Sequence, residues 1–218
     1  MPKISEDEQK KIKDMFSDKM EGDVNILYFS KEDDCEYCED TEEILTEISE
    51  LDDRISLEVN DLDSEKAEKY NIEMAPATIF VDEDGKDRGV RLYGIPSGYE
   101  FNTIIEGIID ISREVPDIPE DMIEKIKEID SEVKIQVFIT PSCPYCPRAV
   151  RVAHQMAMVN DNIRGDMVEA VEFPDLSDKF GVSGVPKTII NDGAAEQVGA
   201  VPLKAIVSKV KKAIAQIK

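Results

Sequence analysis

The chain has 218 residues, of which 41% are hydrophobic and 34% charged, and it contains four cysteines, one histidine and no tryptophan. It has no run of about 18 apolar residues, so no membrane span is predicted, and its net charge of −22 disfavours nucleic acid and anionic lipid because phosphates would be repelled. The charged first residues lack the apolar core of a signal peptide, which predicts a soluble, cytoplasmic protein.

The acidic residues are unevenly distributed along the chain. Residues 1–120 hold 35 Asp and Glu against 13 Lys and Arg, whereas residues 121–218 hold 13 of each kind. The length also suits two domains of roughly 110 residues. We therefore predict two domains, at 1–116 and 117–218, and interpret most of the charges as a solvated surface.

The predicted elements of the first half follow from apolar periodicity and from capping and turn residues. In chain order they are a helix opened by a Ser5–Glu8 capping box, a strand at 24–29, a helix from Cys35, a strand at 55–60, a short helix at 65–70, a strand at 78–81, a turn at DEDG, a returning strand at 90–94 and a helix through Phe101 and Ile108.

The pattern restarts near residue 117 and repeats. Asp117 is predicted to cap a helix with Pro119 in its first turn, and a final helix opens at Pro202. Aligning Val24 with Val133 places VNILYF over VKIQVF, CEYC against CPYC, and KYNIEMAPATIFV against KFGVSGVPKTIIN. This shared context indicates an internal duplication. Each half therefore forms a helix and then β-α-β-α-β-β-α, which predicts an α/β fold with two mixed sheets flanked by helices.

These motifs resemble the thioredoxin fold, in which a strand leads to a CxxC at the next helix and a later proline precedes another strand. CPYC is typical of glutaredoxins. Two such units, with YGIPSGYEF and GDMVEAVEFPDLSDKFGVSGVP, resemble the glutaredoxin-like protein disulfide oxidoreductases of thermophilic archaea and bacteria. The resemblance covers nearly the whole chain. It implies reduction, formation or isomerisation of protein disulfides, with a flavin-dependent thioredoxin reductase as electron source.

The resemblance also assigns roles to the prolines that follow each CxxC. It implies cis peptide bonds before Pro76 and Pro186, which lie beside the disulfides in this fold. The backbone of Ala75 and Val185 would then pair with an extended substrate segment.

The chemistry needs thiolates, because the thiolate is the nucleophile of disulfide exchange. A helix N-terminus favours the thiolate through its free N–H groups and a partial positive charge of about half a unit. Cys35 and Cys143 are predicted to be the exposed attacking sulfurs, and Cys38 and Cys146, nearly one turn later, to resolve the mixed disulfides. The exchange itself needs no bound cofactor.

The two sites are predicted to differ in acidity. Six carboxylates lie within residues 32–40 around Cys35, opposed only by Lys31, and like charges disfavour a thiolate. No Asp or Glu lies within ten residues of Cys143, and Arg148 follows it. We therefore predict a lower thiol pKa and a more oxidising couple at Cys143 and Cys146, and a more reducing, slower couple at the other pair.

The same residues allow other interpretations. The two CxxC pairs could hold zinc or an iron–sulfur cluster, but 104 residues separate Cys38 from Cys143, so no metal site is predicted. His154 follows Cys143 by eleven residues, about 16 Å along a helix, which excludes a Cys–His nucleophile within that helix. A surface or interface histidine is the favoured interpretation. Tyr37 and Tyr145 suit packing or the border of a substrate groove equally well.

The sequence leaves two alternative functions open and offers no residue for the usual proton acceptor. The chain could relay electrons from a flavin-dependent reductase to a peroxidase, or it could be a peptide-binding chaperone whose thiols are incidental. CPYC is also compatible with glutathione. Thioredoxin-type sites often keep a buried acid under the thiols as proton acceptor, but the first strands offer only Tyr28, Phe29, Val137 and Phe138 there, so no such acid is predicted.

Overall fold

The computed structural model describes residues 3–82 and 84–217. The first unit runs through α1 (Glu6–Lys19), β1 (Val24–Ser30), α2 (Cys38–Ser49), β2 (Ile55–Asp61), α3 (Glu65–Lys69), β3 (Ala77–Val81), β4 (Asp87–Tyr93), the 3₁₀ turn η1 (Gly98–Glu100) and α4 (Phe101–Ser112). The second unit runs through α5 (Glu120–Lys127), β5 (Val133–Ile139), α6 (Cys146–Val159), β6 (Ile163–Glu169), α7 (Pro174–Lys179), β7 (Lys187–Ile190), η2 (Asn191–Gly193), β8 (Ala195–Val198) and α8 (Leu203–Ile217). This element order confirms the predicted duplication.

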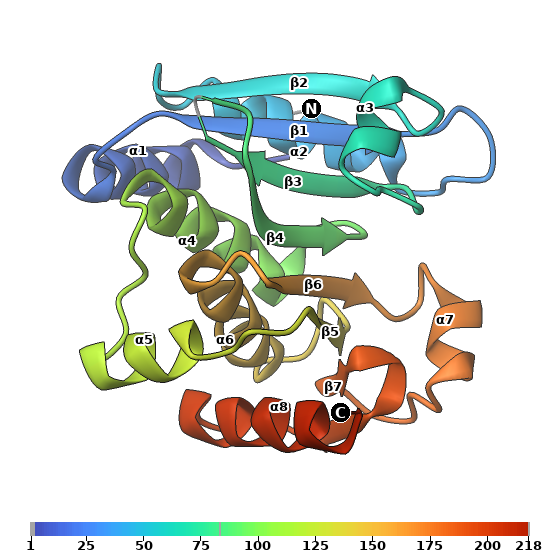
Figure 1. The fold of residues 1–218 in the computed structure, drawn as a ribbon. Helices are drawn as coiled ribbons and strands as arrows, with labels where there is room; N and C mark the ends of the chain where they lie inside the picture. The colour runs from blue at the N-terminus through green and yellow to red at the C-terminus, as the bar shows by residue number, and fades with distance from the viewer. Residues whose placement is uncertain (1–2, 83, 218) are drawn as a thin grey trace.

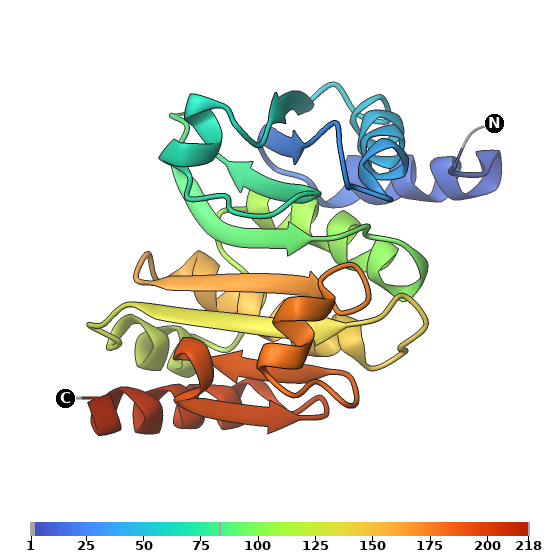
Figure 2. The same ribbon diagram turned by 90° about the vertical axis from the view of Figure 1, so that its right-hand side faces the viewer.

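The strands form one continuous sheet in the order β2-β1-β3-β4-β6-β5-β7-β8 (Figure 2). Each unit contributes the expected four-stranded mixed sheet, but the two are not separate. β4 pairs in parallel with β6, with Arg91 opposite Asp166. Both are edge strands of their own units, and pairing them satisfies backbone groups that an open edge would leave without partners.

Helices cover both faces of this sheet (Figure 1). On one face, α1, α2, α4, α5, α6 and α8 pack into a core that runs through both units. On the other face, a smaller core lies under α3 and α7. Alternate residues of β1 serve the two cores, since Ile26 and Tyr28 belong to the first and Leu27 and Phe29 to the second.

The predicted helix starts are partly right. The Ser5–Glu8 capping box is present, with the Ser5 side chain accepting from Glu8 N and the Glu8 side chain accepting from Ser5 N. The Asp117 cap is wrong: α5 is capped at Pro119, whose carbonyl accepts from Met122 N at 2.8 Å and closes the first turn there.

The two CxxC helices also begin later than predicted. They start at Cys38 and Cys146 rather than at the first cysteine of each pair. Tyr37 caps α2, and its carbonyl accepts from Thr41 N. The first cysteine of each pair therefore lies in the loop that leads into the helix.

Side chains across the unit boundary reinforce the shared sheet. Arg151 on α6 forms ion pairs with Glu106 and Asp110 on α4. His154 on α6 is buried, with its Nε2 3.2 Å from the backbone oxygen of Arg91 on β4. It is thus an interface residue between the units and not a surface one. Within residues 3–82 and 84–217, no helix is long and apolar enough to cross a membrane.

Candidate active sites

Each CxxC pair forms a disulfide at the carboxyl end of a central strand. Cys35 and Cys38 follow β1, and Cys143 and Cys146 follow β5. The Cα atoms are 5.5 Å apart in both pairs, with χ3 angles of 85° and 88°. We call these pairs with their surroundings the first and second sites. Among the described residues, no group of three or more His, Cys, Asp or Glu side chains could hold a metal ion.

The first cysteine of each pair is the more accessible one, as predicted, but the exposure is small. Cys35 is partly exposed, whereas Cys38 is 7% exposed. Cys143 is 8% exposed and Cys146 is fully buried. Cys143 is thus less exposed than expected for an attacking sulfur.

A proline lies at the equivalent position of both units. The Ala75–Pro76 and Val185–Pro186 peptide bonds are cis, which confirms the expectation from the family resemblance. Pro76 O accepts from Gly94 N at 3.0 Å, and Pro186 O accepts from Gly199 N at 2.8 Å. Within the described part of the chain, the backbone groups of Ala75 and Val185 have no hydrogen-bond partner.

The groove at the first site is built by both units. A pocket of about 480 Å³ is lined by residues of the CxxC loop, by the Pro76 segment, and by the second unit's loop after β6 with the first residue of α7. Its lining residues are Asp34, Cys35, Glu36, Tyr37, Ala75, Pro76, Val171, Glu172 and Pro174. The predicted residues of this site therefore meet, and the second unit adds three that the sequence did not suggest.

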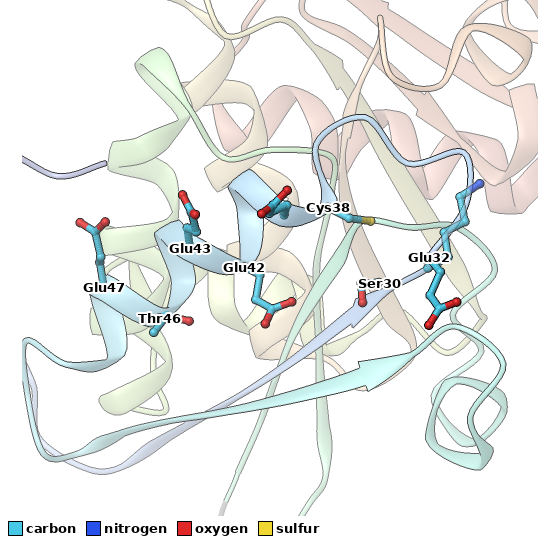
Figure 3. Close-up of a pocket in the computed structure, with 9 residues that line it drawn as sticks. Ser30, Glu32, Cys38, Glu42, Glu43, Thr46 and Glu47 are labelled. Carbon is cyan, nitrogen blue, oxygen red and sulfur yellow. The ribbon is translucent and has the colours of Figure 1, made fainter. Parts of the chain in front are cut away.

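A second, acidic pocket lies between α2 and the end of β1. Figure 3 shows the side chains of Glu42, Glu43 and Glu47 along this helix, with the sulfur of Cys38 at its beginning. The pocket measures about 610 Å³. The predicted charge around Cys35 is more compensated than the sequence indicates, because Lys3 forms ion pairs with Asp40 and Glu43 in addition to the Lys31–Asp34 pair.

The two tyrosines inside the motifs differ. Tyr37 is half-buried and lines the first groove, where the charge of Glu36 raises the pKa of its hydroxyl. Tyr145 is 71% exposed beside the second site. Beneath the first site, Tyr28 is buried and donates a hydrogen bond to Cys38 O at 2.7 Å, so a phenol and not an acid lies at that position.

A buried acid does lie next to the second site, and it comes from the first unit. Glu100 ends η1, which packs against α6, and its neighbour Tyr99 donates its N–H to Pro141 O in the loop before Cys143. Glu100 is fully buried, and Thr103 Oγ1 donates to its Oε2, but its Oε1 has no partner. Burial raises the pKa of this carboxyl from 4.5 to about 7.

Two further acids adjoin the first site. Glu169 is 3% exposed, and burial raises the pKa of its carboxyl. Glu172 is half-buried, and burial, together with the charges of Glu169 and Glu36, raises its pKa to about 7. In both cases backbone N–H donors oppose the rise. None of the three acids was predicted, because each lies on the other unit from the site it adjoins.

The comparison with known proteins agrees with this geometry. Residues 14–109 match the family model described as a thioredoxin-like domain, and residues 133–212 match the one described as a thioredoxin domain. The crystal structure of a protein disulfide oxidoreductase from Aeropyrum pernix K1 is 30% identical, with a TM-score of 0.88 over 97% of this chain and 94% of that one. This chain belongs to the protein disulfide oxidoreductases with two thioredoxin-like units.

The oxidoreductase is also similar to part of a larger enzyme. It is 30% identical over 190 residues to the alkyl hydroperoxide reductase AhpF of Staphylococcus aureus, a match that covers 87% of this chain and 34% of that protein. It thus spans about a third of the length of these curated relatives. The NTD_N/C domain of AhpF from Enterococcus faecalis is 26% identical, with a TM-score of 0.87 over 95% of this chain and 99% of that one.

Proposed function

We propose that this protein reduces, forms or isomerises disulfides of other proteins through thiol–disulfide exchange at both CxxC sites. The observation that carries the proposal is the pairing of each CxxC disulfide with a cis-proline segment whose preceding residue keeps unpaired backbone groups. An extended client segment can pair with those groups as an added strand does, which would bring its disulfide to the reactive sulfur. A cytoplasmic location is part of this proposal.

In the reducing direction, the first cysteine of a reduced site attacks a client disulfide as a thiolate. One client sulfur joins it in a mixed disulfide and the other leaves as a thiolate that takes up a proton. The second cysteine then attacks the sulfur of the first, which closes the enzyme disulfide, breaks the mixed disulfide and releases the client sulfur held in it as a thiolate that takes up the second proton. Two electrons and two protons pass to the client. Oxidation is the same sequence in reverse, and Cys35, Cys38, Cys143 and Cys146 carry it.

We assign a proton-holding role at the second site to Glu100. Its unpaired oxygen, its burial, the contact of η1 with α6 and the hydrogen bond from Tyr99 N to Pro141 O support this assignment. A carboxyl that titrates near neutral pH can accept a proton from a thiol and return it to a leaving thiolate. The electron source we propose is a flavin-dependent thioredoxin reductase, which would regenerate the dithiols.

The test is the reduction of insulin disulfides by the reduced protein, with cysteine variants as controls. We expect Cys35→Ser/Cys38→Ser and Cys143→Ser/Cys146→Ser each to retain part of the activity, and the variant with all four substitutions to lose it. If that variant still prevents aggregation of a client as well as the parent protein does, the thiols are incidental and a chaperone is the better description.

The second candidate is an electron relay from a flavin-dependent reductase to a peroxidase. It is favoured by the similarity to the alkyl hydroperoxide reductase AhpF over 87% of this chain. A relay needs both couples in series, so single Cys35→Ser and Cys143→Ser variants should each stop NADH-driven peroxide turnover in a reconstituted system. Loss in Cys143→Ser alone would argue against a relay.

A further inference from the structure

The groove beside Cys35 contains a carboxyl group that the exchange described above does not use. Glu172 reaches this groove from the loop between β6 and α7 of the second unit and lines it together with Cys35 and Pro76. The charged or titratable groups of the first unit that share the pocket with it are Asp34, Glu36 and Tyr37. The first site is therefore incomplete without the second unit.

The carboxylate of Glu172 is held in place by the backbone at Gly94 and Ile95. Its Oε1 accepts a hydrogen bond from Ile95 N at 2.7 Å. The residue before, Gly94, has φ 99° and donates its N–H to Pro76 O. A Cβ at Gly94 would lie 2.7 Å from Glu172 Oε1 and 2.5 Å from Glu169 Cβ. Only glycine allows these carboxyls to lie so close to the Pro76 segment.

Glu172 is not part of an ion pair in the described part of the chain. Its charged or titratable surroundings are Glu36 and Tyr37 from the CxxC loop, Tyr28 from β1 and Glu169 from β6. Glu169 is 3% exposed and its Oε1 has no partner. A pair of carboxyls so placed favours keeping one proton between them.

We propose that Glu172, backed by Glu169, holds the proton that Cys35 releases when the first site attacks a disulfide. This inference rests on the exchange proposed for Cys35. It makes the first site a composite of the two units. The two sites then use acids of different origin, because Glu100, the acid near the second site, comes from the first unit.

Protons and electrons balance in this exchange. The Cys35 thiol gives its proton to the Glu172 carboxylate, and the Cys35 thiolate attacks one sulfur of the client disulfide. A bond forms between Cys35 Sγ and that sulfur while the client S–S bond breaks. The other client sulfur leaves with the electron pair and takes the proton back from Glu172. Cys38 then loses its proton and attacks Cys35 Sγ, so that the Cys35–Cys38 bond forms while the bond from Cys35 to the client sulfur breaks. That client sulfur leaves with the electron pair and takes up the second proton, which makes the dithiol the donor of two electrons and two protons.

Two simpler roles for Glu172 predict different results. If Glu172 only fixes the loop through Ile95, Glu172→Gln should be harmless, because the amide oxygen can accept the same hydrogen bond, whereas Glu172→Ala should be harmful. If Glu172 acts only as a negative charge, removing it should favour the Cys35 thiolate and speed every reaction of that sulfur. If Glu172 instead holds the proton, removing its carboxyl should slow disulfide reduction.

The experiment uses the full chain with Cys143→Ser/Cys146→Ser, so that only the first site reacts. Insulin disulfide reduction and alkylation of the reduced protein by iodoacetamide are followed from pH 5.5 to 9. Glu172→Gln should slow insulin reduction at pH 8 by about a hundredfold, the low end of the range for general acid–base catalysis, while alkylation is not slowed. The rise of the rate through pH 7 should disappear.

Glu36→Gln is the matched control, because it removes a charge from the same pocket with no proton-holding role, and both of its rates should rise. An unchanged or faster insulin reduction in Glu172→Gln would overturn the proposal. If the parent variant with Cys143→Ser/Cys146→Ser does not reduce insulin at all, the exchange at the first site fails, and this inference fails with it. The two failures are therefore distinguishable.

Discussion

Replacing Glu100 by glutamine should stabilise the oxidised protein at neutral and alkaline pH. The wild-type carboxyl is fully buried, and only one of its oxygens has a partner, the hydroxyl of Thr103. Because burial raises its pKa in the folded state, folded Glu100 keeps its proton at pH values where the unfolded chain has lost it. The stability that this group contributes is therefore fully present below pH 4.5 and is lost as the pH rises through about 7.

The size of the effect follows from the two pKa values. The folded value is about 7 and the ordinary value is 4.5. At about 1.36 kcal/mol for each pKa unit, ionising the buried group costs on the order of 3 kcal/mol above pH 7. Glu100→Gln keeps the shape and the acceptor for Thr103 but cannot ionise. It should be about as stable as wild type near pH 4.5 and about 3 kcal/mol more stable at pH 8.

The assay is urea unfolding of both proteins with their disulfides intact, at several pH values from 4.5 to 8. Intact disulfides keep the thiols from titrating, so the difference between the two proteins isolates Glu100. Glu124→Gln, an exposed substitution on α5, serves as the control for removing one carboxyl group. A stability difference that stays constant across this range, or a variant less stable than wild type at pH 8, would refute the assignment of a buried, neutral carboxyl.

Three further results are expected. Equilibration in thiol buffers should give the second site a less negative reduction potential than the first, and a gap of only about 30 mV corresponds to about 1.4 kcal/mol. Equal potentials would contradict the argument that the carboxylates around Cys35 disfavour its thiolate. Gly94→Ala should lower the free energy of unfolding by about 1–3 kcal/mol in a thermal unfolding experiment, because its Cβ would lie 2.5 Å from Glu169 Cβ. Gly199→Ala should lower it by less, because Gly199 also has a positive φ but its Cβ would have nothing within 4 Å. Burial lowers the pKa of His154 to about 4, so the stability that it contributes is present above about pH 6.5 and is lost as the pH falls toward 4. In urea unfolding, the free energy of unfolding of His154→Gln should therefore fall less than that of wild type as the pH is lowered.

Much of the fold could be predicted from local signals. The apolar periods, the capping box and the repeated CxxC and proline contexts give all the helices and strands in their right order. The helix starts at Cys38 and Cys146 were missed because the capping residues there are tyrosines, which offer no side-chain cap. The joining of the two sheets was missed because β4 and β6 pair over a long sequence separation, and such pairing leaves no local pattern.

The site was predictable only as far as each unit contains it. The sulfurs and the proline segments lie within one duplicated unit, and the repeat itself pointed to them. Glu100 and Glu172 serve sites on the opposite units, so no motif spacing links them to the cysteines. The sequence does show that Glu100 lies directly before the apolar face of a predicted helix. A charged residue at such a position is ordinarily interpreted as solvated, so this signal does not indicate burial. Only the packing of η1 against α6 shows that it is buried.

The joining of the units makes duplicated sites chemically different. β4 and β6 are not equivalent strands, so the units are joined head to tail and not by a symmetric contact. Gly94 and Gly199 hold the two proline segments in the same way, but Gly94 lies against Glu169 and Glu172 while Gly199 faces open space. Glu172 of the other unit therefore lines the first groove with Glu169 behind it, whereas the second site has only the single buried Glu100 assigned to it from the other unit. Local charge shifts a thiol's pKa and hence its redox potential, so this asymmetry of packing is a physical basis for two couples of unequal strength in one chain.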